Sequence, residues 1–399
     1  MTSANPQPDA EPGDVIVNVF GRTDVGRVRD HNEDAFLVAD LTADNASLQP
    51  EVRTHLVGSH GSLFMVADGL GGAAAGEVAS ELAILTVQSE LRAQWRSAPE
   101  RTPEVFARAI KSAAESANAK IFAYAVDHPE SRGLGTTATI AGLLGDTLYI
   151  AQVGDSRAYL VRNGVALQIT KDQSLMQRLI EAGELTPEEA ERSERRNIIL
   201  QALGPEPTVK IDLTYQKVRR GDTLVLCTDG LSGLVRKDEI AEILQQSNDD
   251  LLIACRELID RANENGGPDN ITVIVARFDG EGLLAPDEEE TVGHAVFPLP
   301  GSSTPTSPRQ RFAESSTAPF RRRNTGAMPP AAPEPTPPVT PIATPRPMSK
   351  RGRSILFLVA GILLAITVLL ALRIYRTGVI HRTKPEPVHP TPGDSGIRA

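Results

Sequence analysis

Cysteine and histidine are scarce in this sequence. There are two cysteines, Cys227 and Cys255, and seven histidines in 399 residues. Two thiols are too few for a disulfide framework or a thiolate metal site, and they indicate a reducing compartment. Residues 1–14 also lack the basic start and the apolar core of a secretory signal, so we expect them to form a disordered lead-in.

A surplus of basic residues is missing from the front of the chain. The formal net charge is -10 overall; residues 279–399 carry 14 Lys and Arg against 10 Asp and Glu, which leaves -14 on residues 1–278. Nucleic-acid binding needs surplus Lys and Arg to neutralise phosphates. The charge therefore excludes nucleic acid as a partner of this part of the chain.

The composition changes after residue 278. Fifteen of the 30 prolines lie between residues 279 and 349, mixed with Ser, Thr and Ala. A segment of this kind cannot bury enough apolar surface to offset the entropy lost on ordering. We therefore predict one folded domain at residues 15–278, followed by a Pro-rich disordered linker at residues 279–353.

An apolar run of 19 residues without charge follows the linker, from Ser354 to Leu372. As a helix with a rise of about 1.5 Å per residue it would be roughly 28 Å long, close to the hydrocarbon thickness of a bilayer. The alternative is a buried core helix, but a helix behind a long linker has no core to enter. We predict one transmembrane helix at residues 354–372 and a short C-terminal tail at residues 373–399.

The orientation of this helix is not decided by charge. Four Lys or Arg residues lie within twenty residues on each side of it, so the positive-inside rule is a tie. Because no signal peptide is recognisable, we expect a single-pass protein of the plasma (inner) membrane. Its folded domain would then be cytoplasmic and its tail external.

The folded domain combines strand and helix patterns. Strand-like runs include "DVIVNVFG", "SLFMVA", "TTATIAGLLGDTLYIAQV", "RAYLV", "DTLVLC" and "NITVIVARF". Amphipathic helix patterns lie at residues 77–92, 106–121, 174–192 and 237–264. Tight turns between strands favour antiparallel sheets, and the helices would cover them. We predict an α+β fold with a central β-sandwich of two antiparallel sheets flanked by helices.

Acidic residues recur at the ends of the predicted strands. In "FMVADG" and "LVLCTDG" an aspartate closes an apolar run and is followed by glycine. One such Asp-Gly is most often a plain turn. Two further aspartates stand at predicted strand ends, in "QVGDSRAY" and "GGPDNITV". Four aspartates at strand ends, with an acidic pair in "HNEDAF", favour a shared site. The residues concerned are Asp68, Asp155, Asp229 and Asp269, together with Glu33 and Asp34.

Such a site would suit a hard divalent cation. Converging carboxylates repel one another by several kcal/mol at intermediate dielectric and need neutralisation. Mg²⁺ and Mn²⁺ prefer oxygen ligands of this kind. No histidine stands beside Asp68, Asp229 or Asp269, which argues against zinc. Glycine after the aspartate also lets a main-chain carbonyl approach an ion.

Six stretches of the sequence, in order, resemble the motifs of a known enzyme family. They are "VGRVRDHNEDAF", "FMVADGLGGAAAGEVAS", "GTTATIAGLLGDTLYIAQVGDSRAYLVRNG", "ITKDQSLMQRLIEAGELTPEEAERSERRNIILQALG", "LVLCTDGLSGLV" and "GGPDNITVIV". Over about residues 15–278 the chain resembles the metal-dependent PPM (PP2C-type) protein serine/threonine phosphatases. It looks most like their bacterial branch, whose members oppose eukaryotic-like Ser/Thr kinases. The resemblance implies a metal cluster in a cleft at one edge of the β-sandwich.

The resemblance also implies a set of metal ligands. Asp68 would bridge two Mn²⁺ or Mg²⁺ ions, and the carbonyl of Gly69 would complete one shell. Asp229 and Asp269 would hold the second ion. Asp155, with Asp229, would supply a third and weaker site.

For the reaction, the resemblance implies that a hydroxide shared by two ions attacks phosphorus in phosphoserine or phosphothreonine. Arg29 would bind the phosphate, and Glu33 and Asp34 would act mainly through metal-bound waters. Two positions depart from relatives. Leu70 stands where eukaryotic relatives have a histidine that is a candidate general acid. Gln173 replaces a histidine of many relatives just before the family's flap.

The expected function is hydrolysis of phosphorylated proteins, Ser/Thr kinases included, by a membrane-anchored phosphatase. Two alternatives are open. The first is a metal-dependent hydrolase of small phosphoesters, which a comparison of rates on phosphopeptides and small aromatic phosphates would separate. The second is a catalytically silent tethered module that binds phosphopeptides. The complete acidic set argues against the silent module.

Overall fold

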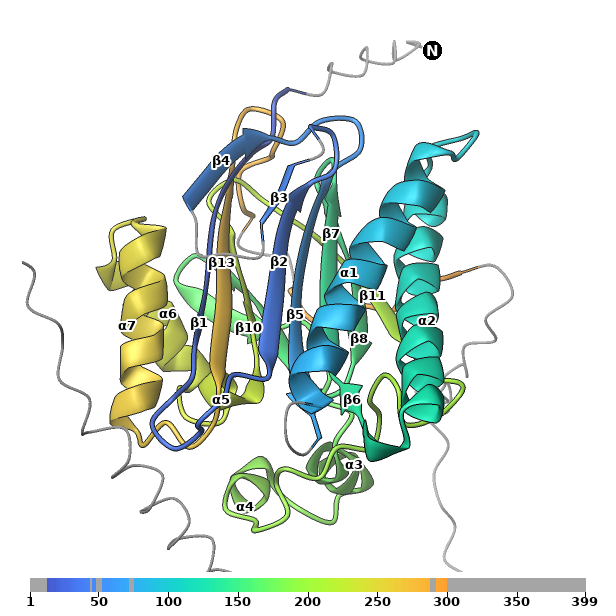
Figure 1. The fold of residues 1–399 in the computed structure, drawn as a ribbon. Coiled ribbons are helices and arrows are strands. Elements are labelled where there is room, and N and C mark those ends of the chain that lie inside the picture. Colours follow the sequence, from blue (N-terminus) through green and yellow to red (C-terminus); the bar gives the residue numbers. More distant parts are fainter. Residues whose placement is uncertain are drawn as a thin grey trace, which may run out of the picture. The chain divides into compact units, whose positions relative to one another are not determined.

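Two antiparallel sheets lie face to face at the centre of the folded domain in the computed structural model (Figure 1). The structure describes residues 13–43, 45–47, 52–71, 75–131, 133–287 and 292–299. Apolar side chains of both sheets, among them Val19, Phe64, Ile150 and Ile274, form one buried layer between them. The predicted α+β sandwich is confirmed.

The first sheet has six strands. In spatial order they are β10 (Val165–Gln168), β9 (Arg157–Arg162), β12 (Thr223–Cys227), β13 (Ile271–Asp279), β1 (Ile16–Asp24) and β4 (Val52–Leu56). The second sheet runs in the order β11 (Asp212–Lys217), β8 (Thr147–Val153), β7 (Ala138–Leu144), β5 (Ser62–Leu70), β2 (Asp34–Asp40) and β3 (Asn45–Ser47), with β6 (Gly135–Thr136) paired to β5.

Helices cover both outer faces of the sandwich (Figure 1). The second sheet is covered by α1 (Ala75–Arg96) and α2 (Pro103–Asp127), and the first by α6 (Lys237–Gln246) and α7 (Leu251–Glu264). The remaining helices are short: the 3₁₀ helix η1 (Pro129–Ser131), α3 (Leu175–Ala182), α4 (Pro187–Glu191) and α5 (Asp229–Ser232). Each sheet is therefore buried on two sides.

Strand β5 shows why its sequence is apolar without a break. Side chains of a strand point alternately to opposite faces. Leu63 and Met65 enter the layer under α1 and α2, while Phe64 and Val66 enter the layer between the sheets. The sequence led us to expect that this strand ends at Asp68, but it does not. The strand runs on to Leu70 because β6 supplies partners for its last two residues.

Two helical patterns of the sequence are each divided in the structure. The run at residues 174–192 becomes α3 and α4, because Gly183 adopts a left-handed conformation with φ 73° and ends α3. The run at residues 237–264 becomes α6 and α7, and Asp250 caps the second helix by accepting from the N–H groups of Leu252 and Ile253.

The folded domain extends beyond residue 278, where the predicted boundary lay. Residues 292–299 run along the edge strand β11, where Tyr215 N–H donates to Ala295 O at 2.9 Å and Phe297 N–H donates to Leu213 O at 2.9 Å. The Phe297 ring meets those of Tyr149 and Tyr215 edge to face, at 5.4 and 5.6 Å. This edge strand accepts a partner because its outer N–H and C=O groups are otherwise unpaired.

Several predicted segments lie outside the described residues. They are residues 1–12 of the lead-in, most of the linker, the predicted transmembrane helix at residues 354–372 and the tail. Within the ranges that the structure describes, no helix has both the length and the apolar character to cross a bilayer.

Candidate functional site

Five aspartates from separate elements face one another at one end of the sandwich. Asp34 begins β2 and stands opposite Asp68 in the β2–β5 register. The other three lie at the β8–β9 turn, at the first position of α5 and just before β13. We call this group the carboxylate cluster: Asp34, Asp68, Asp155, Asp229 and Asp269. The pKa of Asp68 is influenced by each of the other four carboxyls.

Burial and mutual repulsion raise the pKa values of four aspartates in the cluster, Asp34, Asp68, Asp155 and Asp229. For Asp34 and Asp155 the pKa rises to about 7, chiefly because burial disfavours the charged form and secondly because Asp229 lies near both. The pKa of Asp68 is raised well above its ordinary value by the same causes. The pKa of Asp229 also rises, through burial and then the charge of Asp269. The cluster therefore favours positive charge at its centre.

Two hydroxyl groups hold Asp34. Its Oδ2 accepts hydrogen bonds from Thr228 Oγ1 at 2.8 Å and Thr272 Oγ1 at 2.7 Å. Its other oxygen, Oδ1, is buried and has no hydrogen-bond partner, and the same holds for Oδ1 of Asp155. Buried carboxylate oxygens without a partner are costly unless a cation or water satisfies them.

The backbone around Asp68 is held by two threonines. Asp68 N–H donates to Thr137 Oγ1 at 3.0 Å, and Asp68 O accepts from Thr136 Oγ1 at 2.8 Å. Both threonine side chains are fully buried. The carboxylate therefore projects from a fixed main chain, a requirement for a precisely placed ligand.

The glycine after Asp68 permits a close approach of main chains. A Cβ on Gly69 would lie 2.3 Å from Gly76 O and 2.5 Å from Glu33 O. Gly69 N–H also donates to Glu33 O at 3.1 Å. The glycine thus brings the start of α1 and the residue before β2 against the cluster. The Gly76 N–H partly offsets the burial that raises the pKa of the Glu33 carboxyl.

Arg29 reaches the cluster through an ion pair. One terminal nitrogen donates to Asp269 Oδ2 at 2.8 Å, and the two side chains are 48% and 29% exposed. This bond is the main reason that the pKa of Arg29 rises further above its ordinary value. The partner is therefore neither Asp30 nor Glu33, the neighbours that a plain surface ion pair would have used.

Asn270 organises the loop that carries Arg29 and Glu33. Its Oδ1 accepts from Glu33 N–H at 2.8 Å, and its Nδ2 donates to Val25 O at 3.0 Å and His31 O at 2.9 Å. Sequence reasoning missed this residue, as it missed Thr228 and Thr272. In the sequence, the one signal that could have identified these three residues was their position near the predicted ligands Asp229 and Asp269.

The residues present fit hard divalent cations. The donors are carboxylate oxygens, two of them buried without partners, and cations of the Mg²⁺ and Mn²⁺ kind favour such sets. In the part of the chain that the structure describes, no three acidic, His or Cys side chains are already closed into a metal cage.

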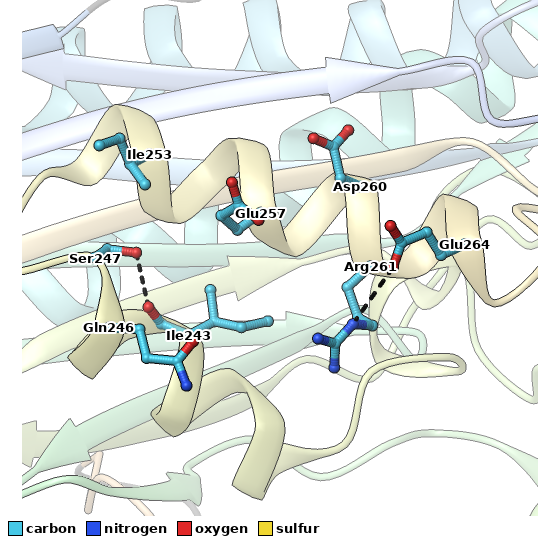
Figure 2. A pocket seen from close by; sticks show the side chains of 8 residues that line it. All are labelled: Ile243, Gln246, Ser247, Ile253, Glu257, Asp260, Arg261 and Glu264. Atoms are coloured by element: carbon cyan, nitrogen blue, oxygen red, sulfur yellow. Dashed lines mark hydrogen bonds and ion pairs between the residues drawn. The ribbon is translucent and has the colours of Figure 1, made fainter.

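Two other features of the domain carry no comparable chemistry. Cys227 is fully buried, and burial raises the pKa of its thiol to about 12, so it is a core residue and not a nucleophile. A pocket of about 280 Å³ opens between α6 and α7 and is lined by side chains such as Ser247, Asp260 and Arg261 (Figure 2). Its lining contains no member of the carboxylate cluster.

Known proteins are similar to this chain in sequence. Residues 43–264 match the family model of Protein phosphatase 2C. The chain is 38% identical over 259 residues to the serine/threonine phosphatase stp of Listeria monocytogenes, an alignment that covers 65% of this chain and 94% of that protein. It is 36% identical over 263 residues to the serine/threonine protein phosphatase PstP of Mycobacterium tuberculosis, covering 66% of this chain and 45% of PstP.

A solved structure extends the comparison to the fold. The crystal structure of a PstP catalytic domain in complex with two manganese ions superposes with a TM-score of 0.53 at 34% sequence identity. The match covers 66% of this chain and 99% of that chain.

Proposed function

This chain belongs to the protein phosphatase 2C family and is a metal-dependent protein serine/threonine phosphatase of the bacterial type, and we propose that its reaction takes place at the carboxylate cluster. The observation that supports this most directly is the pair of buried, unpartnered oxygens on Asp34 and Asp155. Burial and the repulsion of neighbouring carboxylates raise the pKa values of Asp34, Asp68, Asp155 and Asp229. Such a group is stable in its charged form only with cations.

We assign the ligands by position and surroundings. Asp68 and the Gly69 carbonyl would hold the ions of a two-ion centre together with Asp229 and Asp269, and Asp155 would contribute to a weaker third site. Either Mn²⁺ or Mg²⁺ suits this donor set. When bound, these ions supply the neutralising charge and an activated water for in-line attack on phosphorus.

Arg29 would bind the phosphoryl group of the substrate. In the structure its guanidinium pairs with Asp269 and is half exposed, so it can exchange that carboxylate for phosphoryl oxygens. A planar guanidinium forms two parallel hydrogen bonds to such oxygens, which a lysine cannot do. Arg29 would thereby orient the phosphorus and balance the charge that accumulates on it.

Asp34 and Glu33 would orient water molecules. Asp34 is fixed by Thr228 and Thr272 through one oxygen, which leaves the other free to accept from water. Leu70 carries no proton to give. The leaving seryl or threonyl oxygen would therefore take its proton from water.

The cellular setting belongs to the same proposal. Phosphorylated proteins, Ser/Thr kinases among them, would be the substrates. The uncharged run at residues 354–372 would anchor the chain to the plasma membrane with the catalytic domain in the cytoplasm. PstP of M. tuberculosis is likewise longer than its matching segment, which makes up 45% of it.

The test is Mn²⁺-dependent release of phosphate from a phosphothreonine peptide by the full chain. We expect Asp68→Asn to lower kcat by about a hundredfold or more, because an aligned anionic ligand is lost. Asp260→Asn, on the exposed side of α7, is the matched control and should leave the rate unchanged. Full activity in the presence of a strong chelator would refute the assignment. Comparable rates on a small aromatic phosphate would instead indicate a small-phosphoester hydrolase.

A further inference from the structure

The two ends of the flap segment, residues 174–199, lie side by side. The flap carries α3 and α4, below the β6 end of the sheets in Figure 1. Ser174 and Ile199 form an isolated antiparallel bridge, and Leu175 N–H donates to Ile198 O at 2.9 Å. Leu200 N–H then donates to Gln173 O at 2.7 Å. Main-chain hydrogen bonds therefore join the beginning of the flap to its end, and Gln173 lies directly before this junction.

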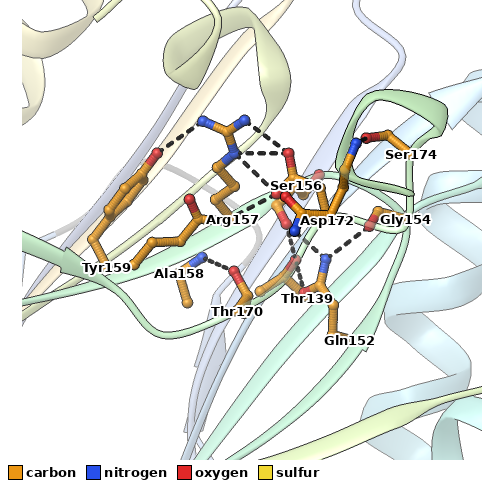
Figure 3. A network of polar contacts seen from close by, with 12 residues as sticks. Thr139, Gln152, Gly154, Ser156, Arg157, Ala158, Tyr159, Thr170, Asp172 and Ser174 are labelled. Carbon is orange, nitrogen blue, oxygen red and sulfur yellow. Dashed lines mark hydrogen bonds and ion pairs between the residues drawn. The ribbon is translucent and has the colours of Figure 1, made fainter. Parts of the chain in front are cut away.

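The turn that carries Asp155 is held by its neighbours. Gly154 has a φ of 97°, and a Cβ there would lie 2.6 Å from Thr137 Cγ2. Gln152 Nε2 donates to Gly154 O at 3.1 Å and to Ser156 O at 2.7 Å (Figure 3). The turn is thus fixed through its main chain, while Oδ1 of Asp155 has no partner.

Gln173 joins this turn to the flap and to β11. Its main-chain N–H donates to Gly154 O at 2.8 Å, and its side-chain Oε1 accepts from Gly154 N–H at 3.1 Å. Its Nε2 donates to Asp212 Oδ2 at 3.0 Å. One residue therefore binds both polar groups of Gly154 and, at the same time, a carboxylate of the edge strand.

The residue before Gln173 is itself locked. Arg157 Nε donates to Asp172 Oδ1 at 3.0 Å, and its terminal nitrogen donates to Asp172 Oδ2 at 2.7 Å (Figure 3). Arg157 also donates to Tyr159 OH at 3.2 Å. A two-point ion pair of this kind fixes direction as well as distance. This ion pair consequently fixes the main chain next to Gln173 and thereby restricts the direction in which the Gln173 side chain points.

We propose that Gln173 is a positioning residue that makes the flap and the Asp155 turn move as one unit. The role of this unit in catalysis rests on the function proposed above, but the coupling is a property of the fold. Glutamine suits the position because it accepts from Gly154 and donates to Asp212 with one planar group. A residue with only acceptors would meet the Asp212 carboxylate with like charge.

The test reverses the direction of one hydrogen bond. Gln173→Glu keeps an oxygen that can accept from Gly154 N–H, but it places a second carboxylate opposite that of Asp212. Combining it with Asp212→Asn restores a donor opposite the new acceptor, because the asparagine amide can donate. Asp212→Asn alone still accepts from Gln173 and loses only its exposed pair with Lys210. Gln177→Glu introduces the same charge within the flap, where the native side chain donates to Glu181 in an exposed hydrogen bond, and is the matched control.

The coupling is measured on the full chain without metal, by hydrogen exchange of residues 150–156 and 174–200 and by tryptic cleavage at Arg195 and Arg196. We expect Gln173→Glu to accelerate both about three- to tenfold, the size expected for one lost hydrogen bond. The double variant should return to within about twofold of the unaltered chain. Equal acceleration in the single and double variants, or in Gln177→Glu, would overturn the proposal.

A second measurement connects the coupling to the active site. In a calorimetric Mn²⁺ titration, Gln173→Glu should weaken the weakest binding step about three- to tenfold and the double variant should restore it. In the phosphopeptide assay the same pattern should appear in KM more than in kcat. If the unaltered chain shows no Mn²⁺-dependent turnover, the proposed function is refuted. The coupling between the flap and the Asp155 turn is decided by the metal-free measurements alone.

Discussion

Asp34 and Asp68 stand directly opposite each other on the neighbouring strands β2 and β5. Like charges in this position of an antiparallel pair destabilise a sheet. Desolvation also raises the pKa of Asp34 to about 7 and the pKa of Asp68 well above its ordinary value. The sheet thus carries an unfavourable pair at the end that holds the other cluster aspartates, and a cation would convert it into a binding site.

The first prediction concerns Asp68→Asn and stability. Without metal, removing this charge relieves repulsion with Asp34 and Asp229, so the melting temperature should rise by several degrees. Addition of Mn²⁺ should stabilise the unaltered chain but not the variant. Thermal melts with chelator and with Mn²⁺ measure both effects. A variant that melts lower without metal and is still stabilised by Mn²⁺ would contradict the assignment.

The second prediction concerns pH. A carboxyl whose folded pKa exceeds its unfolded value binds more protons when folded, so stability falls as pH rises between the two values. For Asp34 and Asp155 that window runs from 3.8 to about 7. The metal-free chain should therefore become less stable as pH rises from about 5 to 7, within that window. Urea unfolding across this range should show the fall, and saturating Mn²⁺ should reduce it.

The third prediction tests the hydroxyls that hold Asp34. Thr272→Val and Thr228→Val each remove a hydrogen bond that lowers the Asp34 pKa, so each should cost about 1 kcal/mol of stability at pH 8. Turnover should also shift to higher pH. Thr214→Val is the control, since its buried Oγ1 has no hydrogen-bond partner. Equal losses in the three variants would mean that only packing is affected.

The fourth prediction concerns Arg29→Lys. The lysine keeps the positive charge but loses the planar guanidinium, which can bind two phosphoryl oxygens at once. The kcat/KM for a phosphothreonine peptide should therefore fall about tenfold. Arg256→Lys, in an exposed pair with Glu257, serves as the control. An unchanged kcat/KM would show that Arg29 serves only as the ion-pair partner of Asp269.

The fifth prediction concerns the segment beyond the predicted domain boundary. Phe297→Ala removes ring contacts with Tyr149 and Tyr215 and should cost about 1 to 3 kcal/mol, since the ring is half-buried. A chain ending at residue 299 should accordingly be more stable than one ending at residue 287. Urea unfolding of both chains decides the point, and equal midpoints would place the boundary nearer residue 278.

Much of the fold could be predicted from the sequence. The apolar runs and amphipathic patterns identify the strands and helices because burial imposes their periodicity. The sequence analysis did not place residues 292–299 in the folded domain, because their composition is that of a linker. Their pairing depends on the free edge of β11 and on two aromatic rings from other strands, and neither is visible in the local sequence.

The candidate site divides in the same way. The chemical character of the site is visible in the sequence, because four aspartates beside apolar runs, two of them followed by glycine, suit oxygen-preferring cations if they converge. The way in which these side chains are held depends on contacts between distant segments of the chain. Thr272 reaches Asp34 and Asn270 reaches Glu33 across more than 230 positions of the chain. Such hydrogen bonds depend on strand register between distant segments, which local periodicity does not encode.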